Sequence, residues 1–140
     1  MTARALAAIA LGVALVSGGC VHYPTVMEAG GTMVRSDKGR AVRQGAGAAA
    51  VYFDLKSSGT YGDVVTGVHT PIARQARLVD ARGAPLSRVD VPGGSVMRFT
   101  ADGPHVVLTD LTRPLAAGDT IIVTLVLQKA GGLGVIATVE

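Results

Sequence analysis

Hydrophobic and polar residues alternate along much of the chain after residue 45. The alternation is clearest in residues 48–55 and in residues 120–128, where every second position is apolar. A period of two residues is typical of a β-strand that buries one face. In residues 120–128 the opposite face is also fairly apolar, which predicts a central strand. The positions predicted to form the core are Val51, Phe53, Ile121, Val123 and Leu125.

Short segments of the same kind recur, separated by turn-forming residues such as the Pro-Gly-Gly sequence at residues 92–94. The predicted strands are residues 48–55, 63–70, 76–79, 87–91, 95–100, 105–108, 120–128 and 134–139. No sustained helical period follows residue 20. The pattern predicts one all-β domain over residues 45–140, an antiparallel β-sandwich or small barrel of seven or eight strands.

The first 19 residues are typical of an export signal. Arg4 supplies a positive charge, residues 5–16 form an uncharged stretch rich in Ala and Leu, and small residues lead to Cys20. The apolar stretch is too short to span a bilayer comfortably, so residues 1–19 are predicted to be a cleaved signal peptide. The Gly-Gly-Cys sequence resembles a bacterial lipobox, although Ser17 stands where Leu is usual. We expect lipidation of Cys20; the alternative is an ordinary signal peptide cleaved near this residue.

Residues 20–44 are predicted to tether the lipid to the domain, with a short first strand at residues 32–34 as an option. Residues 36–44 are polar and basic, which favours a solvated loop; weak contact with anionic lipid headgroups is the alternative. The protein is therefore expected outside the cytoplasm, in the periplasm or cell envelope of a bacterium, and anchored to the membrane.

Composition excludes several classes of function. The formal net charge is only +3 and the basic residues are scattered, so we expect no binding of nucleic acid. Cys20 is the sole cysteine, which rules out an intramolecular disulfide bond. The sequence has no nucleophile elbow, no Walker loop and no cluster of zinc-type ligands, so we expect a protein that is not an enzyme.

Four linked segments resemble the periplasmic copper chaperones called PCuAC. They are Gly-Ala-Ala-Ala-Val-Tyr-Phe-Asp-Leu at residues 47–55, DVVTGVHTPIA at residues 63–73, Val-Pro-Gly-Gly at residues 91–94, and HVVLTDLTRPLAAGDTIIVT at residues 105–124. The resemblance extends over roughly residues 45–140. It implies a cupredoxin-like, immunoglobulin-like β-sandwich that binds copper and helps to supply it to cytochrome oxidase.

The family's copper site, as the resemblance implies it, uses a His, a Met in the following hairpin, and a later His-x-Met. His105 matches the later His, but Val107 stands at its Met partner. The earlier His falls at about Val79, and the Met-bearing hairpin is replaced by a short turn at residues 81–85. Methionine and histidine are suitable ligands for Cu(I), but a single imidazole cannot hold copper tightly.

Three residues are candidates for a rebuilt Cu(I) site. His105 is the centre, and Met97 is its soft partner if their strands pair as a hairpin; His69 is the third candidate. Without a metal role, Met97 would pack in the core and His69 would lie at a surface turn. Two functions stay open. One is a divergent copper chaperone acting with cytochrome oxidase assembly factors or thiol copper carriers, and the other is a non-metal binding or structural lipoprotein.

Overall fold

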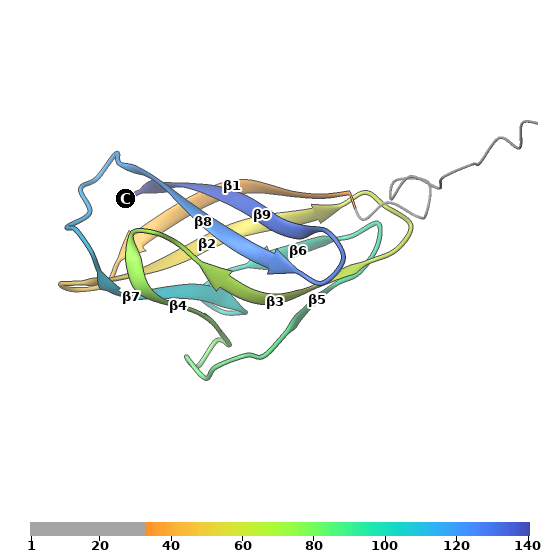
Figure 1. Ribbon diagram of the computed structural model, residues 1–140, viewed down its shortest axis with the longest axis horizontal. Coiled ribbons are helices and arrows are strands. Elements are labelled where there is room, and N and C mark those ends of the chain that lie inside the picture. Colours follow the sequence, from red (N-terminus) through yellow and green to blue (C-terminus); the bar gives the residue numbers. More distant parts are fainter. Residues whose placement is uncertain (1–32) are drawn as a thin grey trace, which may run out of the picture.

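A computed structural model describes residues 33–140, which form nine β-strands and no helix (Figure 1). The strands are β1 Val34–Arg43, β2 Ala48–Ser57, β3 Asp63–His69, β4 Ala73–Val79, β5 Val89–Val91, β6 Val96–Phe99, β7 His105–Leu111, β8 Thr120–Leu127 and β9 Gly131–Val139. All eight predicted strands are present, with ends shifted by a few residues. Within residues 33–140 there is accordingly no apolar helix that could cross a membrane.

The strands form one curled sheet in the order β4-β7-β2-β1-β9-β8-β3-β5, and β6 also pairs with β2. Neighbours are antiparallel except β1 and β9, which run parallel where Arg40 pairs with Thr138 and Ala41 with Val139. The curl brings β3 and β4 near each other, so the two halves of the sheet face one another as a sandwich (Figure 1). The predicted all-β sandwich is therefore confirmed, although the seven or eight strands expected are nine.

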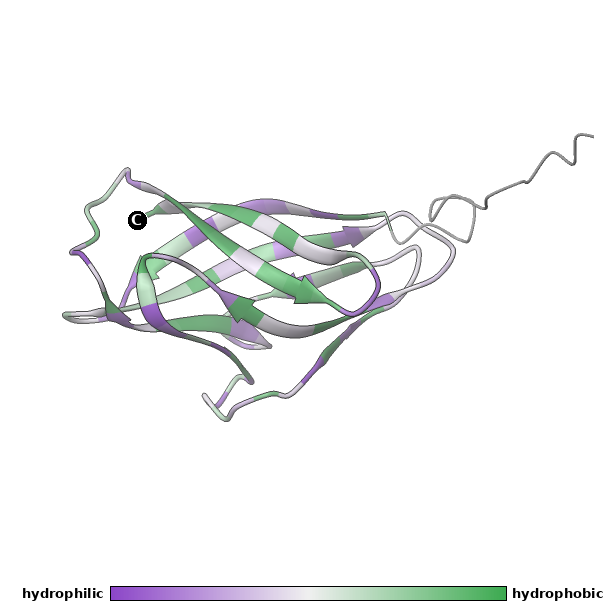
Figure 2. Ribbon diagram, viewed as in Figure 1, coloured by the Kyte–Doolittle hydropathy of each residue, from purple (hydrophilic) through white to green (hydrophobic). Residues whose placement is uncertain are grey.

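The core lies between the two halves and is made mainly of Val, Leu, Ile and Ala. All five predicted core residues are at most 2% exposed: Val51, Phe53, Ile121, Val123 and Leu125. Phe53 and Phe99 add a stacked pair with ring centroids 4.4 Å apart. Figure 2 shows how green and purple bands alternate along the strands, as a two-layer core requires. The period of two residues thus placed the core correctly.

Strand β8 is central in its backbone pairing, because it lies between β9 and β3. Its second apolar face is not buried, however. Ile122 is 54% exposed and Val126 is 38% exposed, and Ile136, which pairs with Ile122 on β9, is 63% exposed. The sequence correctly predicted a strand with neighbours on both sides, but its hydrophobicity overstated how much of it would be covered.

Strand β1 corrects the expectation of a solvated loop at residues 36–44. Eight of its ten residues pair with β2, and a register shift between Asp37 and Arg40 leaves Lys38 and Gly39 unpaired. Within that shift Lys38 has a φ of 54°, and the backbone of Gly39 comes so close to Ile136 that a Cβ would overlap its carbonyl oxygen. Backbone pairing, rather than buried side chains, holds most of this strand, so its polar sequence hid it.

Candidate functional site

His105 opens β7 and is the only histidine buried in the described chain, at 8% exposure. Its Nδ1–H donates to the carbonyl oxygen of Gly103 over 3.0 Å. The ring lies against Tyr52, with centroids 5.6 Å apart and planes tilted by 55°. Because a carbonyl can only accept, this bond leaves Nε2 as the nitrogen with a free lone pair in the neutral ring. Such a bond is also how proteins orient a histidine that binds a metal.

The strand register shows which positions share the face of His105. Val79 on β4 pairs directly with His105, and Arg77 pairs with Val107. Paired residues lie on the same face of a sheet and residues two apart do so as well. The three positions at which the resemblance puts His, His and Met therefore form one patch, here occupied by Val79, His105 and Val107.

This patch does not fit a complete copper site. Valine offers no donor atom, so His105 is the single ligand among the three positions. The guanidinium of Arg77 adds positive charge beside Val107, which opposes the binding of a cation. Within residues 33–140, no three side chains of the His, Cys, Asp and Glu types are grouped as metal ligands would be.

The Met-bearing hairpin implied by the resemblance is replaced by a tight turn after Val79. The carboxylate of Asp80 accepts hydrogen bonds from the backbone N–H groups of Arg82 and Ala84, both over 2.9 Å. The chain then returns along β4, where the N–H of Leu86 donates to the carbonyl of Leu78. The predicted turn is confirmed, and it contains no thioether that could reach His105.

Met97 does not join His105, because the predicted hairpin does not form. Strands β6 and β7 both pair with β2 and lie end to end along it: Met97 is opposite Leu55, whereas Val106 is opposite Val51. Leu55, Val51 and Val106 are core residues, so Met97 faces the core and is packed against it. His105 precedes Val106 and lies on the opposite face of the sheet, where it is buried against Tyr52. The two side chains lie on opposite faces of the sheet and cannot share a metal ion.

His69 is also far from His105. It is exposed at the end of β3, opposite Thr124, and is followed directly by the turn into β4. His105 pairs with Val79 at the other end of β4. Six residues of strand separate the two ends of β4, on the order of 20 Å. The structure thus brings none of the other candidates to His105, and Cys20 lies outside the described residues.

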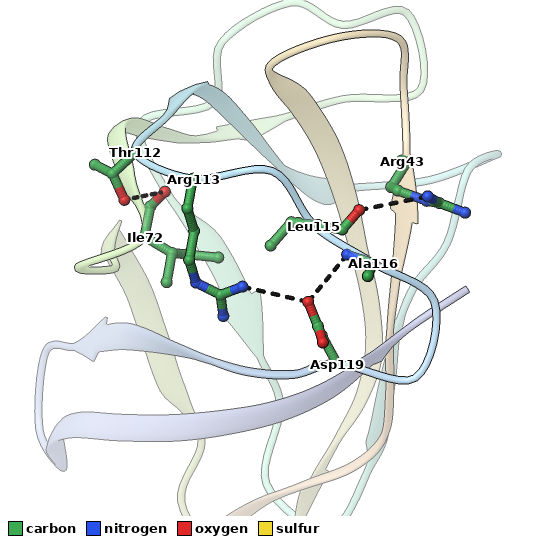
Figure 3. Close-up of polar contacts among 7 residues, drawn as sticks. All are labelled: Arg43, Ile72, Thr112, Arg113, Leu115, Ala116 and Asp119. Carbon is green, nitrogen blue, oxygen red and sulfur yellow. Dashed lines mark hydrogen bonds and ion pairs between the residues drawn. The ribbon is translucent and has the colours of Figure 1, made fainter.

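A second feature, which sequence reasoning missed as a site, is a cavity of about 390 Å³ between the β1–β2 loop and the segment that follows β7. It is lined by residues 43, 45–48 and 111–115. Figure 3 shows its polar framework: Arg43 donates to the carbonyl of Leu115 over 3.4 Å, and Arg113 pairs with Asp119 at 3.2 Å. The Ala116 N–H and the Arg113 guanidinium, both donating to Asp119, lower the pKa of its carboxyl. These polar groups are bonded to one another, so the framework holds the turn.

Comparison with known proteins places this geometry in context. Residues 25–139 match the family described as "Putative lipoprotein LpqE-like". A relative from Leifsonia xyli subsp. xyli, named "Putative lipoprotein Lxx21020", is 31% identical over 136 residues, which cover 89% of this chain and 80% of the relative.

Solved structures with the same fold include copper-chaperone domains. The copper-bound PCuAC domain from PmoF2 superposes with a TM-score of 0.69 at 25% identity, covering 80% of this chain and 95% of that domain. The Cu(I) form of DR1885 from Deinococcus radiodurans gives a TM-score of 0.59 at 25% identity, covering 88% of this chain and 83% of that protein. The predicted resemblance to PCuAC domains is therefore confirmed.

Proposed function

Because this chain belongs to the LpqE-like family of lipoproteins and has the PCuAC fold, we propose that it is a lipid-anchored accessory protein of copper-enzyme machinery outside the cytoplasm. It acts by binding a protein partner and has no complete copper site of its own. The partner class follows from the resemblance and comprises cytochrome oxidase and the proteins that supply its copper. In this proposal the protein is not an enzyme.

The observation that supports this proposal is the patch formed by Val79, His105 and Val107. Among these three positions only the imidazole of His105 could bind copper, which supports an accessory protein without a complete copper site. Anchoring through Cys20 would keep the domain at the membrane, where an oxidase resides. Two or three acyl chains are needed for stable anchoring, and a bacterial lipoprotein carries them at its first cysteine.

A second candidate function is copper transfer through a shared site. The observation that favours it is the hydrogen bond from Nδ1 of His105 to Gly103, which fixes the ring as a metal-binding histidine would require. In this form His105 supplies one imidazole to Cu(I), and the protein that gives or receives the ion supplies the other ligands. Such a site suits delivery to cytochrome oxidase better than storage.

One set of measurements separates these functions. The lipoprotein, purified in detergent, competes for Cu(I) against a chromogenic chelator, beside His105→Ala. Our proposal expects neither protein to retain stoichiometric Cu(I), whereas retention that is lost in His105→Ala would instead establish a divergent chaperone. Cross-linking in intact membranes, followed by purification, is expected to recover oxidase subunits with the wild type and to lose them with Cys20→Ser. Failure to recover any oxidase subunit would refute the proposed partner class.

A further inference from the structure

The seam between β3 and β4 leaves two strand edges open. The strands follow one another along the chain but are not paired, because β4 ends the sheet and β3 pairs with β8. Strand β5 covers the second edge of β3 only over Asp63–Val65. In the described chain, residues 66–69 of β3 and residues 73–77 of β4 therefore each have one edge without a strand partner. Open edges present backbone N–H and C=O groups that can pair with another strand.

A groove runs along this seam. Two cavities, of about 310 Å³ and about 230 Å³, lie between the strands and share Val68, Ala76 and Arg77 in their linings. Val68, Ala76 and Leu86 are partly buried and packed against the core, so they give the groove an apolar floor. An apolar floor between two open strand edges is the setting in which an extended peptide adds to a sheet.

The walls of the groove are cationic. His69, Arg74 and Arg77 are exposed in its lining, and no Asp or Glu lines either cavity. Arg74 lies 3.9 Å from Asp110, at the limit of an ion pair, and both side chains are mostly exposed. Arg77 makes no ion pair with any residue of the part of the chain that the structure describes. The charge of the two arginines is therefore available to a ligand.

We propose that this groove binds an extended, acidic segment of a partner protein, which pairs with an open edge of β3 or β4. The inference rests on the proposed function, since it identifies the surface and the kind of segment through which the partner is bound. Side chains on one side of the segment would contact the floor at Val68 and Ala76, with Arg74 further along that side, because residues two apart on β4 share a face. An acidic side chain on the other side would meet Arg77. The open edge of β4 fits about five residues, or roughly 16 Å of strand.

Other occupants fit this groove less well. A second copy that paired through the same edge would bring the cationic side chains of β4 against each other, which costs stability in directly opposed positions. The preceding residues 20–32 contain a single acidic residue, Glu28, together with Pro24 and two glycines that weaken a strand. Charge complementarity therefore favours an acidic partner.

The test uses a labelled probe and matched variants. The acetylated, fluorescent peptide Glu-Val-Asp-Thr-Glu-Val is titrated against the detergent-purified lipoprotein, and its anisotropy is measured. We expect Arg74→Glu combined with Arg77→Glu to weaken binding at least tenfold. Arg35→Glu combined with Arg98→Glu, a matched pair of exposed arginines outside the groove, should change it less than twofold. Equal losses in the two double variants, or equal binding of a peptide with Lys at the acidic positions, would overturn the inference.

Hydrogen exchange tests for backbone pairing between the peptide and the strand, which binding through charge alone would not produce. The bound peptide should slow amide exchange within residues 66–69 or 73–77, and a peptide N-methylated at alternate residues should not bind. Protection confined to the exposed Ile122 and Ile136 face of β8 and β9 would overturn the proposal. So would sedimentation that shows a dimer abolished by the groove variant, because the occupant would then be a second copy.

Failure of this inference can be told apart from failure of the proposed function. If oxidase subunits are recovered equally with the wild type and with the groove variant, the proposed partner class is supported, but the groove is not its binding site. If the peptide binds as expected but no oxidase subunit is recovered, the groove is supported as a peptide-binding site and the proposed partner class is refuted. Melting curves of both double variants establish that each is folded before either comparison is made.

Discussion

Two regions that resemble PCuAC proteins in sequence differ in what the structure has kept. The turn at residues 112–119 is held by hydrogen bonds: Asp119 accepts from Ala116 and Arg113, and the hydroxyl of Thr112 donates to the carbonyl of Ile72 over 3.1 Å (Figure 3). The patch around His105 lies at the positions that the resemblance assigns to copper ligands, but two of its three residues are valines. Residues of the turn contribute to the stability of the fold, whereas residues that only bind copper do not. Substitutions at the positions of copper ligands therefore leave the sandwich intact. Resemblance in such a chain therefore transfers the fold more safely than the chemistry.

The strongest test of this comparison restores the lost ligands. Val79→His combined with Val107→Met puts two imidazoles and a thioether on one face of paired strands, within the spacing of about 5 Å between paired Cβ atoms. We expect Cu(I) affinity to rise at least ~1,000-fold, or about 4 kcal/mol, over that of the wild type. Competition against a Cu(I) chelator measures the change.

The matched control for that experiment carries the two substitutions together with His105→Ala, which should lose most of the gain. Val79 is buried, so the melting temperature of the apo double variant must be recorded as well. If the folded double variant binds no better than the wild type, the three positions do not form the patch that the register indicates.

A smaller effect is expected at the turn. Asp119→Asn removes the charge that accepts from Ala116 and Arg113, so the melting temperature should fall by roughly 2–5 °C at pH 7. Thermal unfolding followed by circular dichroism measures it. Asp102→Asn, at an exposed loop position, should leave the melting temperature unchanged. Equal shifts in the two variants would mean that the turn is no more important to the fold than any surface loop.

The smallest effect is the pH dependence of that difference. The Ala116 N–H and the Arg113 guanidinium make the pKa of Asp119 lower in the folded chain than in the unfolded chain. The carboxylate therefore stabilises the fold above its unfolded pKa, about 3.9, and this stabilisation is lost as the pH falls through the lower folded pKa. The difference in melting temperature between the wild type and Asp119→Asn should shrink as the pH is lowered from 6 to about 3. A difference that is constant over this range would contradict the assigned pKa shift.

Sequence alone predicted the fold class, eight strands and the core. Apolar residues at every second position, such as Ile121 and Val123, result directly from the burial of one face of a strand. Sequence analysis offered only a short first strand at residues 32–34 and missed the rest of β1, whose sequence is polar and whose contribution is backbone pairing to β2 and β9. It also paired Met97 with His105, because closeness along the chain does not reveal that β6 and β7 lie end to end on β2. The cationic groove could not be found from sequence, since it depends on which strand edges the curled sheet leaves open.

The parallel pairing of β1 with β9 has a consequence for how the protein is made. Ser36 on the first strand bonds to the carbonyl of Gly134 on the last, 98 residues further along the chain. Contacts between such distant residues form slowly, because a long loop must close before they contribute to stability. The sandwich therefore cannot be completed until nearly the whole chain has been synthesised. The export that residues 1–19 predict would benefit from that delay, because a secretion channel for unfolded chains can accept the chain before it folds.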